Sequence, residues 1–142
     1  MILKFLGTKG EIEEFSKKHR YNSSLLLIEK GFKLLLDYGL IHKYSLEKIK
    51  PDAILITHAH PDHYIWTKKE LKTKICVYLT KETLKYGKFK PLNYKIIRAG
   101  KKFSLGPFKV LPYEVMHSLR CPAVGFKIYW DKKILVYNPD LI

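Results

Sequence analysis

Cysteine is scarce in this chain: of 142 residues, only Cys76 and Cys121 carry a thiol. The two lie far apart and in no spacing typical of a metal site, which excludes a disulfide-rich scaffold and a thiolate zinc cluster. Two free thiols or one disulfide remain. Two free thiols are the simpler interpretation, and they indicate a reducing, cytoplasmic location.

Long hydrophobic runs are also lacking. The N-terminal segment 1–7 is apolar, but it is too short and too soon interrupted for a signal peptide. No later run approaches the roughly 20 apolar residues of a membrane span. A chain of this length forms about one domain with its own core. We therefore expect a single intracellular domain over residues 1–142 that does not enter a membrane.

Acidic residues and arginine are few. Asp and Glu total 13 against 27 Lys and Arg, of which only three are Arg, and the formal net charge is +14. The positive electrostatic field of such a chain favours acidic partners, above all nucleic acid and phosphorylated metabolites. A Lys-rich surface is also typical of heat-adapted proteins. Charge alone leaves both interpretations open.

Strands separated by Gly, Pro and Asp-Lys turns account for most of the chain. Short helices are predicted from Ser45 until Pro51, over 65–71, and over 81–86 with Gly87 at the end. The pattern predicts an α+β fold with two sheet layers, mainly antiparallel mixed pairing and a few helices on the outer face. The predicted strands are 1–7, 23–29, 32–36, 53–57, 75–79, 94–98, 102–105, 108–115, 123–130 and 133–137.

Four possible metal ligands follow one apolar strand within six positions: His58, His60, Asp62 and His63. A short, continuous apolar run predicts a strand covered on both faces, and ligands commonly gather where such a strand ends. In a turning loop, imidazoles two positions apart are able to face one ion. Imidazole with carboxylate suits zinc, iron or manganese better than calcium or magnesium. The stretch therefore predicts a metal site.

The other histidines and basic residues in the loops do not indicate a specific site. His19 and His42 lie in no comparable context, and we interpret them as ordinary loop or helix-edge residues. Lys9, His19 and Arg20 in the long loop 8–21 offer contacts to phosphate. The simpler interpretation is a solvated loop.

The segment His58-Ala-His60-Pro-Asp62-His63 resembles the His-x-His-x-Asp-His signature of the metallo-β-lactamase superfamily. Its flanks agree with this resemblance, which covers the chain from end to end. Residues 34–39 resemble the preceding strand with its Asp-x-Gly, residues 115–118 and 125–128 the third motif, and residues 135–140 the fourth. The resemblance implies the αβ/βα sandwich of that family.

The resemblance also implies a ligand set for zinc, with one or two ions, and with manganese or iron as alternatives. One ion is held by His58, His60 and His117, the second by Asp62 and His63, and both by the bridging Asp140.

Two aspartates take further roles from the resemblance. Asp37 accepts hydrogen bonds from the ligand loop and orients it. Asp62 positions a water activated by both ions, or accepts its proton. That water attacks a carbonyl or phosphorus centre, which makes the expected reaction a hydrolysis.

The opening Phe5-Leu-Gly7-Thr, with 22–24, resembles the branch that contains transfer-RNA 3′-processing endonucleases and phosphodiesterases. Together with the positive charge, this favours a phosphodiester or phosphorylated ester, small or nucleic acid, over lactams and thioesters. The alternative is a non-catalytic metal-binding or nucleic-acid-binding module, or one half of a split hydrolase that is inactive without its partner.

The sequence ends two residues after Asp140, where the second half of the family fold begins. The resemblance therefore implies a half or truncated sandwich with one sheet face uncovered. We expect a homodimer, or a complementing chain, to cover that face, because exposed apolar sheets associate in water. A compact domain with a single metal or none is the third alternative.

Overall fold

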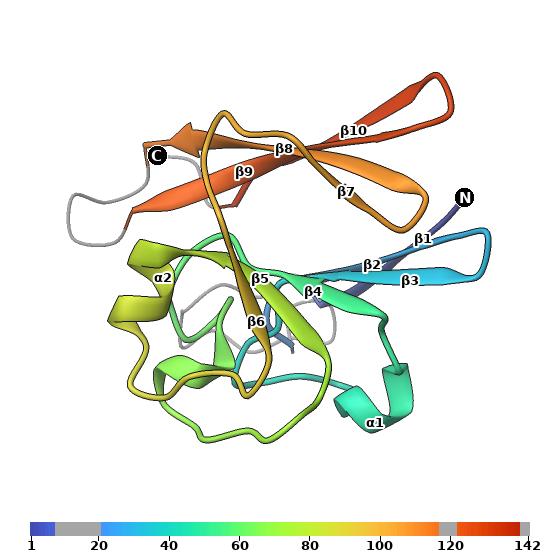
Figure 1. Cartoon of the computed structure of the whole chain (residues 1–142). Coiled ribbons are helices and arrows are strands. Elements are labelled where there is room, and N and C mark those ends of the chain that lie inside the picture. Colours follow the sequence, from blue (N-terminus) through green and yellow to red (C-terminus); the bar gives the residue numbers. More distant parts are fainter. Residues whose placement is uncertain (8–20, 117–121, 140–142) are drawn as a thin grey trace.

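The computed structural model describes residues 1–7, 21–116 and 122–139. They form two β-sheets that pack face to face, and the helices lie on the far side of the larger sheet (Figure 1). The α+β fold with two sheet layers and outer helices is therefore confirmed. The larger sheet buries apolar side chains on both of its faces, and the smaller sheet buries them on the face that it turns to the larger one. The site described below lies at the carboxyl ends of β3 and β4.

The larger sheet has six strands in the order β1-β2-β3-β4-β5-β6. Antiparallel pairing joins β1 to β2 and β2 to β3, and parallel pairing joins β3 through β6. The carboxyl ends of β3, β4, β5 and β6 consequently meet at one edge of the sheet. The bounds are β1 Ile2–Gly7, β2 Ser24–Glu29, β3 Phe32–Leu36, β4 Ala53–Leu55, β5 Cys76–Thr80 and β6 Tyr94–Ile97.

Short helical segments connect the parallel strands, as parallel pairing requires. Helix α1 spans Leu46–Ile49, the 3-10 helix η1 spans Ile65–Thr67, and α2 spans Lys81–Tyr86. Ser45 caps α1, since its Oγ accepts from the backbone N–H of Lys48 at 3.3 Å, and Thr80 caps α2 in the same way. Both N-caps use a hydroxyl, the preferred chemistry at this position.

The smaller sheet is entirely antiparallel and has four strands in the order β10-β9-β8-β7. Its bounds are β7 Phe103–Leu105, β8 Phe108–Val115, β9 Ala123–Trp130 and β10 Lys133–Tyr137. Three of these four strands begin and end where the turn residues predict, because Gly106 and the Asp131-Lys132 tip set tight hairpins.

Two cores lie on opposite faces of the larger sheet. Successive side chains of a strand point to opposite faces, so within β3 Leu34 and Leu36 enter the core between the sheets and Leu35 enters the core under the helices. The run 53–57 is fully buried, which confirms the predicted burial on both faces, but the strand itself, β4, ends at Leu55 rather than at Thr57. Between the sheets lie Leu25, Leu27, Leu55, Phe108, Val110, Phe126 and Ile128; under the helices lie Leu26, Ile54, Ile56, Trp66, Val77 and Leu79.

The helix predicted over 65–71 is wrong beyond Thr67. The indole of Trp66 is fully buried, and its Nε1 donates to the carbonyl of Leu71 at 2.9 Å. This contact pulls the following chain inward along an irregular path. Tyr64, at the N-cap position of η1, provides no side-chain cap. Burial of one large side chain thus overrides the local helical pattern.

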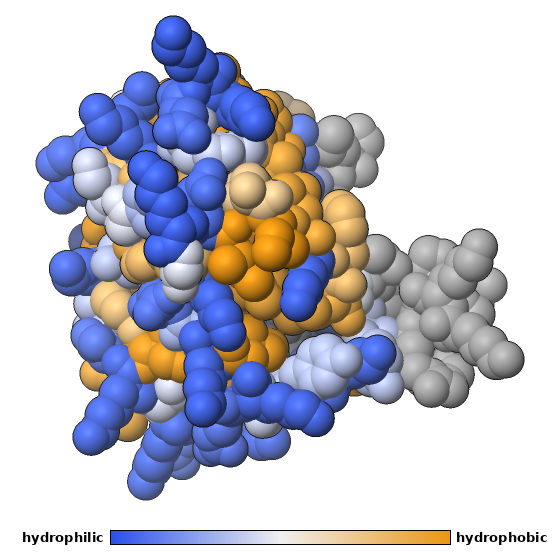
Figure 2. All heavy atoms as spheres, turned by 90° about the vertical axis from the view of Figure 1, so that its right-hand side faces the viewer, coloured by the Kyte–Doolittle hydropathy of each residue, from blue (hydrophilic) through white to orange (hydrophobic). Residues whose placement is uncertain are grey.

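Exposed apolar side chains gather on the outer strands β1 and β10. Phe5 is 70% exposed, and Ile134 and Val136 are 58% and 51% exposed. Figure 2 views the side that carries the N-terminal end of β1 and the β9–β10 turn, and it shows apolar surface in the middle of this side with hydrophilic side chains around it.

Among the described residues, none of the helices combines the length and the apolar composition that crossing a membrane requires.

Candidate metal centre

The site begins where two neighbouring parallel strands end. Asp37 follows β3, and Thr57 and His58 follow β4. The pairing of Leu36 with Leu55 brings these ends together, and the backbone N–H of Asp37 donates to the carbonyl of Leu55 at 2.8 Å. Polar side chains therefore meet at the carboxyl edge of the parallel strands, where ligands bind in sheets of this kind.

Asp37 is fully buried and its carboxylate accepts from four donors of the described chain. Oδ1 accepts from the Thr57 backbone N–H at 2.8 Å, and Oδ2 accepts from the Thr57 hydroxyl at 2.8 Å. Oδ2 also lies 2.6 Å from His63 Nδ1 and accepts from the Tyr137 hydroxyl at 3.3 Å. With a φ of 62°, Asp37 adopts the left-handed conformation that Asp tolerates better than most residues.

These bonds assign the tautomers of two histidines. A carboxylate only accepts, so the proton of the Thr57 hydroxyl and a proton on His63 Nδ1 both point to Asp37. The Thr57 oxygen, which lies 2.9 Å from His58 Nδ1, is then left to accept from that nitrogen. Both rings carry their proton on Nδ1. In the neutral rings, the form in which imidazole binds metal, the lone pairs are then on the Nε2 atoms.

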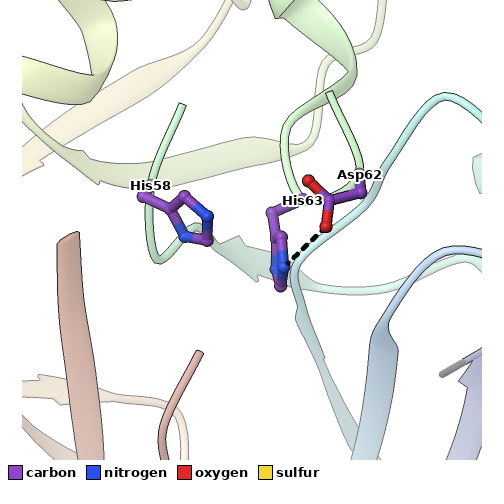
Figure 3. Close-up of side chains that lie close together, drawn as sticks. All are labelled: His58, Asp62 and His63. Carbon is purple, nitrogen blue, oxygen red and sulfur yellow. Dashed lines mark ion pairs between the residues drawn. The ribbon is translucent and has the colours of Figure 1, made fainter. Parts of the chain in front are cut away.

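A tight turn brings the next two polar residues back towards His58. The backbone N–H groups of His63 and Tyr64 both donate to the carbonyl of His60, at 2.9 and 2.8 Å. Figure 3 shows the result, with Asp62 and His63 adjacent and the ring of His58 across from them. One ligand atom from each of these three buried residues lies within 4.8 Å of the other two.

The cluster fits a divalent metal ion. Asp62 Oδ1 is buried and has no hydrogen-bond partner among the described residues, although buried carboxylate oxygens are normally satisfied. Asp62 Oδ2 lies 3.2 Å from His63 Nε2. Two ligand atoms on one tetrahedral zinc ion are separated by roughly 3.3 Å, given metal–ligand bonds near 2 Å. The burial, the donor set and the spacing all suit zinc or a similar ion.

The segment after Asp37 holds the ligand loop in place. The Tyr38 N–H donates to the carbonyl of His63 at 2.9 Å, and the Leu40 N–H donates to the carbonyl of Pro61 at 2.9 Å. Gly39 lies between them, and a Cβ atom there would stand 2.6 Å from the carbonyl carbon of Asp62. In the Asp-x-Gly sequence, the aspartate thus accepts hydrogen bonds, and the glycine is small enough for the backbone of the ligand loop to pack against it.

Gly39→Ala is expected to weaken zinc binding because the new methyl group pushes on the Asp62 backbone. The overpacking should also cost about 1–3 kcal/mol of unfolding free energy. Gly31→Ala is the matched control: Gly31 has a φ of 78° but no atom within 4 Å of the added methyl group. It should lower stability by about 1–2 kcal/mol through backbone strain and leave zinc affinity unchanged, as measured by calorimetric titration. Equal zinc affinity in both variants would contradict the prediction.

Of the other predicted ligands, the structure describes only His60. The ring centroid of His60 lies 4.7 Å from that of His58, but in the described chain His60 is not part of the cluster of three ligand atoms. His117 and Asp140 lie outside the described residues, as do Lys9, His19, Arg20 and Cys121. His42 stacks on Tyr38, with ring centroids 4.4 Å apart.

Sequence reasoning overlooked two residues that contact Asp37. Thr57 is visible in the sequence as the single polar residue between the apolar run and His58, and this position was the available signal. Tyr137 lies 100 positions from Asp37 and donates to it from β10. No local pattern predicts that bond, which links the smaller sheet to the site.

A cavity of about 210 Å³ opens beside the cluster. Its lining includes His63, Tyr137 and Phe5, from three different parts of the chain. The cavity reaches His63, and β1 and β10, the outer strands of the two sheets, both contribute to its lining. A small group is therefore able to approach His63 from outside.

Two tyrosines beside the ligand loop stay protonated at neutral pH. Burial raises the pKa of the Tyr38 hydroxyl above its ordinary value, with a smaller contribution from the charge of Glu47. Burial also raises the pKa of Tyr64. Tyr38 accordingly acts as a donor, to the carbonyl of Tyr44 at 2.8 Å, and neither side chain adds negative charge to the site.

Comparisons with known proteins find matches that cover most of this chain. A sequence model of the family described as "Beta-lactamase superfamily domain" matches residues 19–142. Ribonuclease Z of Methanopyrus kandleri is 26% identical over an aligned length of 148 residues, and the alignment covers 93% of this chain and 51% of that protein. The chain thus spans about half the length of this relative.

Two solved structures show the same fold. The metallo-β-lactamase fold protein YhfI from Bacillus subtilis matches with a TM-score of 0.71 at 18% identity, over 97% of this chain and 62% of that one. The short form of human tRNase Z matches with a TM-score of 0.60 at 17% identity, over 94% of this chain and 67% of that one.

Proposed function

The chain belongs to the β-lactamase superfamily, and from this membership and its buried His-Asp cluster we propose that it is a metal-dependent hydrolase of phosphodiesters or other phosphorylated esters. The observation that carries the proposal is the convergence of His58, Asp62 and His63, with Asp62 Oδ1 buried and lacking a hydrogen-bond partner among the described residues. Zinc is the proposed ion.

In the proposed reaction, the metal ion and the side chains of the protein have different roles. A divalent ion at this site supplies a water nucleophile with a lowered pKa and stabilises the negative charge that develops during attack. Asp37 keeps the His63 ring fixed directly and the His58 ring through Thr57. Asp62 Oδ1 is proposed to position the attacking water or to accept its proton.

The proposed substrate class rests on charge and on relatives. A net charge of +14 attracts polyanions over a distance. The names of the relatives from Methanopyrus kandleri and human describe a ribonuclease and a tRNase. Both features favour a phosphodiester over an uncharged amide or thioester for this chain.

The proposal is tested with bis(p-nitrophenyl) phosphate, a small phosphodiester that needs no specific substrate pocket. The zinc- or manganese-loaded protein is expected to release p-nitrophenol, to lose this activity in a chelator, and to regain it when metal is restored. His60→Ala should also lower turnover if His60 is the ligand that the resemblance implies. Stoichiometric metal binding without turnover on a broad panel of phosphodiesters and esters would instead support a non-catalytic metal-binding module.

A further inference from the structure

A larger cleft, of about 690 Å³, lies at the end of the two sheets. Its walls come from the start of α2, the end of β6, the end of β8 and the start of β9. This volume lies in the range of pockets that bind small organic ligands, roughly 300–1,000 Å³. A lone phosphate ion would leave most of it empty.

The strand register brings the cleft wall next to Thr57, the residue before His58. Val124, in the cleft wall, donates its N–H to the carbonyl of Thr57 at 2.9 Å. Thr80 of β5 also lines the cleft, and it pairs with Ile97, the residue before Arg98. Since neighbouring strands are about 4.8 Å apart, Arg98 lies two strands, or roughly 10 Å, from the strand that leads to His58. A separation of roughly 10 Å is comparable with the length of a nucleotide.

The polar lining is mixed and includes an unusual cation. Lys81 and Arg98 line the cleft together with Glu82 and Glu114, and all four are exposed. Arg98 is the one arginine in the described part of a chain whose other cations there are lysines. The planar guanidinium binds phosphate oxygens through two parallel hydrogen bonds, which an ammonium group cannot do.

The rest of the wall is apolar. Ile97, Ala123 and Val124 are buried, and Ile96 is partly open to solvent. Such a surface packs against a flat organic group, while the two glutamates are acceptors for its hydroxyl or amino hydrogens. The combination of cations, acceptors and apolar wall matches the parts of a nucleotide better than those of an inorganic anion.

We propose that this cleft binds a nucleotide portion of the substrate next to the ester held at the metal centre. Arg98, assisted by Lys81, binds a phosphate of that nucleotide, and the apolar wall with Glu82 and Glu114 takes its nucleoside. The inference deepens the proposed function and rests on it for the placement of the scissile ester.

The test measures binding of adenosine 5′-monophosphate and of adenosine by calorimetry, with no hydrolysis involved. The wild-type protein should prefer the monophosphate, and Arg98→Ala should reduce that preference about tenfold or more, as expected for losing a charge-assisted contact. Arg98→Lys should restore it only in part. Lys133→Ala, an exposed cation at the start of β10, is the control and should retain the full preference.

Either of two results would overturn the inference: equal affinity for the monophosphate and adenosine, or an unchanged preference in Arg98→Ala. The second would mean that the phosphate binds elsewhere, for example at the metal centre. Turnover of bis(p-nitrophenyl) phosphate separates this inference from the proposed function. If the protein hydrolyses this substrate but Arg98→Ala leaves nucleotide binding unchanged, only the nucleotide cleft is contradicted. If Arg98→Ala weakens nucleotide binding but the protein shows no hydrolysis, only the hydrolase function is contradicted.

Discussion

Asp37→Ala is expected to lower the free energy of unfolding by about 3–5 kcal/mol, the usual cost of removing one partner from a buried charged network. The variant leaves the Thr57 N–H, the Thr57 hydroxyl and His63 Nδ1 without their acceptor. Alanine also tolerates the φ of 62° poorly. Urea denaturation followed by Trp fluorescence measures the loss.

A second variant at position 37 separates the role of Asp37 in orienting the metal ligands from its role in folding stability. Asp37→Asn keeps the size of the side chain and tolerates the left-handed conformation, but it presents a donor where Asp37 accepts. Zinc affinity should fall about 10- to 100-fold, as is typical when a residue that orients a ligand is replaced, with a smaller loss of stability than for alanine. Asp52→Ala is the control, since Asp52 is an exposed carboxylate that accepts from the Lys33 N–H. Wild-type stability in Asp37→Ala would contradict the role assigned to Asp37.

Asp62→Ala is expected to reduce turnover of bis(p-nitrophenyl) phosphate by about 10²- to 10⁴-fold, the range associated with a positioned acid or base. The variant also removes one of the proposed ligands, so zinc affinity should fall with it. Because the Asp62 carboxylate has one oxygen near His63 Nε2 and the other without a partner in the described part of the chain, its loss should cost little folding stability in the metal-free protein. Turnover should be measured at saturating zinc to isolate the chemical role.

The control for Asp62→Ala is again Asp52→Ala, which should retain wild-type turnover. An Asp62→Ala variant that binds zinc and hydrolyses the substrate at the wild-type rate would remove Asp62 from the mechanism. A variant that loses zinc binding but keeps its folding stability would show that Asp62 acts only as a metal ligand.

Local sequence patterns predicted most of the strands, and the gathering of polar side chains in segment 58–63, for a physical reason. Apolar runs such as 34–36 and 53–56 are buried on both faces of the sheet, and burial of that kind leaves little choice of residue. The segment 58–63 concentrates its ligands within one turn, so the cluster of His58, Asp62 and His63 is short-range in sequence. These features therefore appear in any short window of the chain.

What local patterns did not predict depends on contacts between distant segments. β4 ends at Leu55, two residues earlier than expected, and the N–H of Thr57 bonds to the Asp37 carboxylate. The bond from Tyr137 to Asp37 joins two different sheets, and the burial of Trp66 reduced a predicted helix to one short turn. Each of these results from tertiary contact energy, which no short window contains.

Several expectations from the sequence stay predictions. They include the ligands His117 and Asp140, the homodimer or complementing chain, and the cytoplasmic location. For the second chain we propose the exposed apolar side chains on β1 and β10 as the packing surface. Light scattering over a range of concentrations tests the homodimer, and a monomer at all of them would exclude it.

The central claim is that His58, Asp62 and His63 hold a metal ion. The most direct measurement is anomalous diffraction from crystals of the zinc-loaded protein, recorded on both sides of the zinc absorption edge. We expect an anomalous peak within bonding distance of His63 Nε2 and an Asp62 oxygen, with His58 Nε2 on the same ion or on a second one beside it. Absence of an anomalous peak at these side chains in zinc-saturated crystals would contradict the claim.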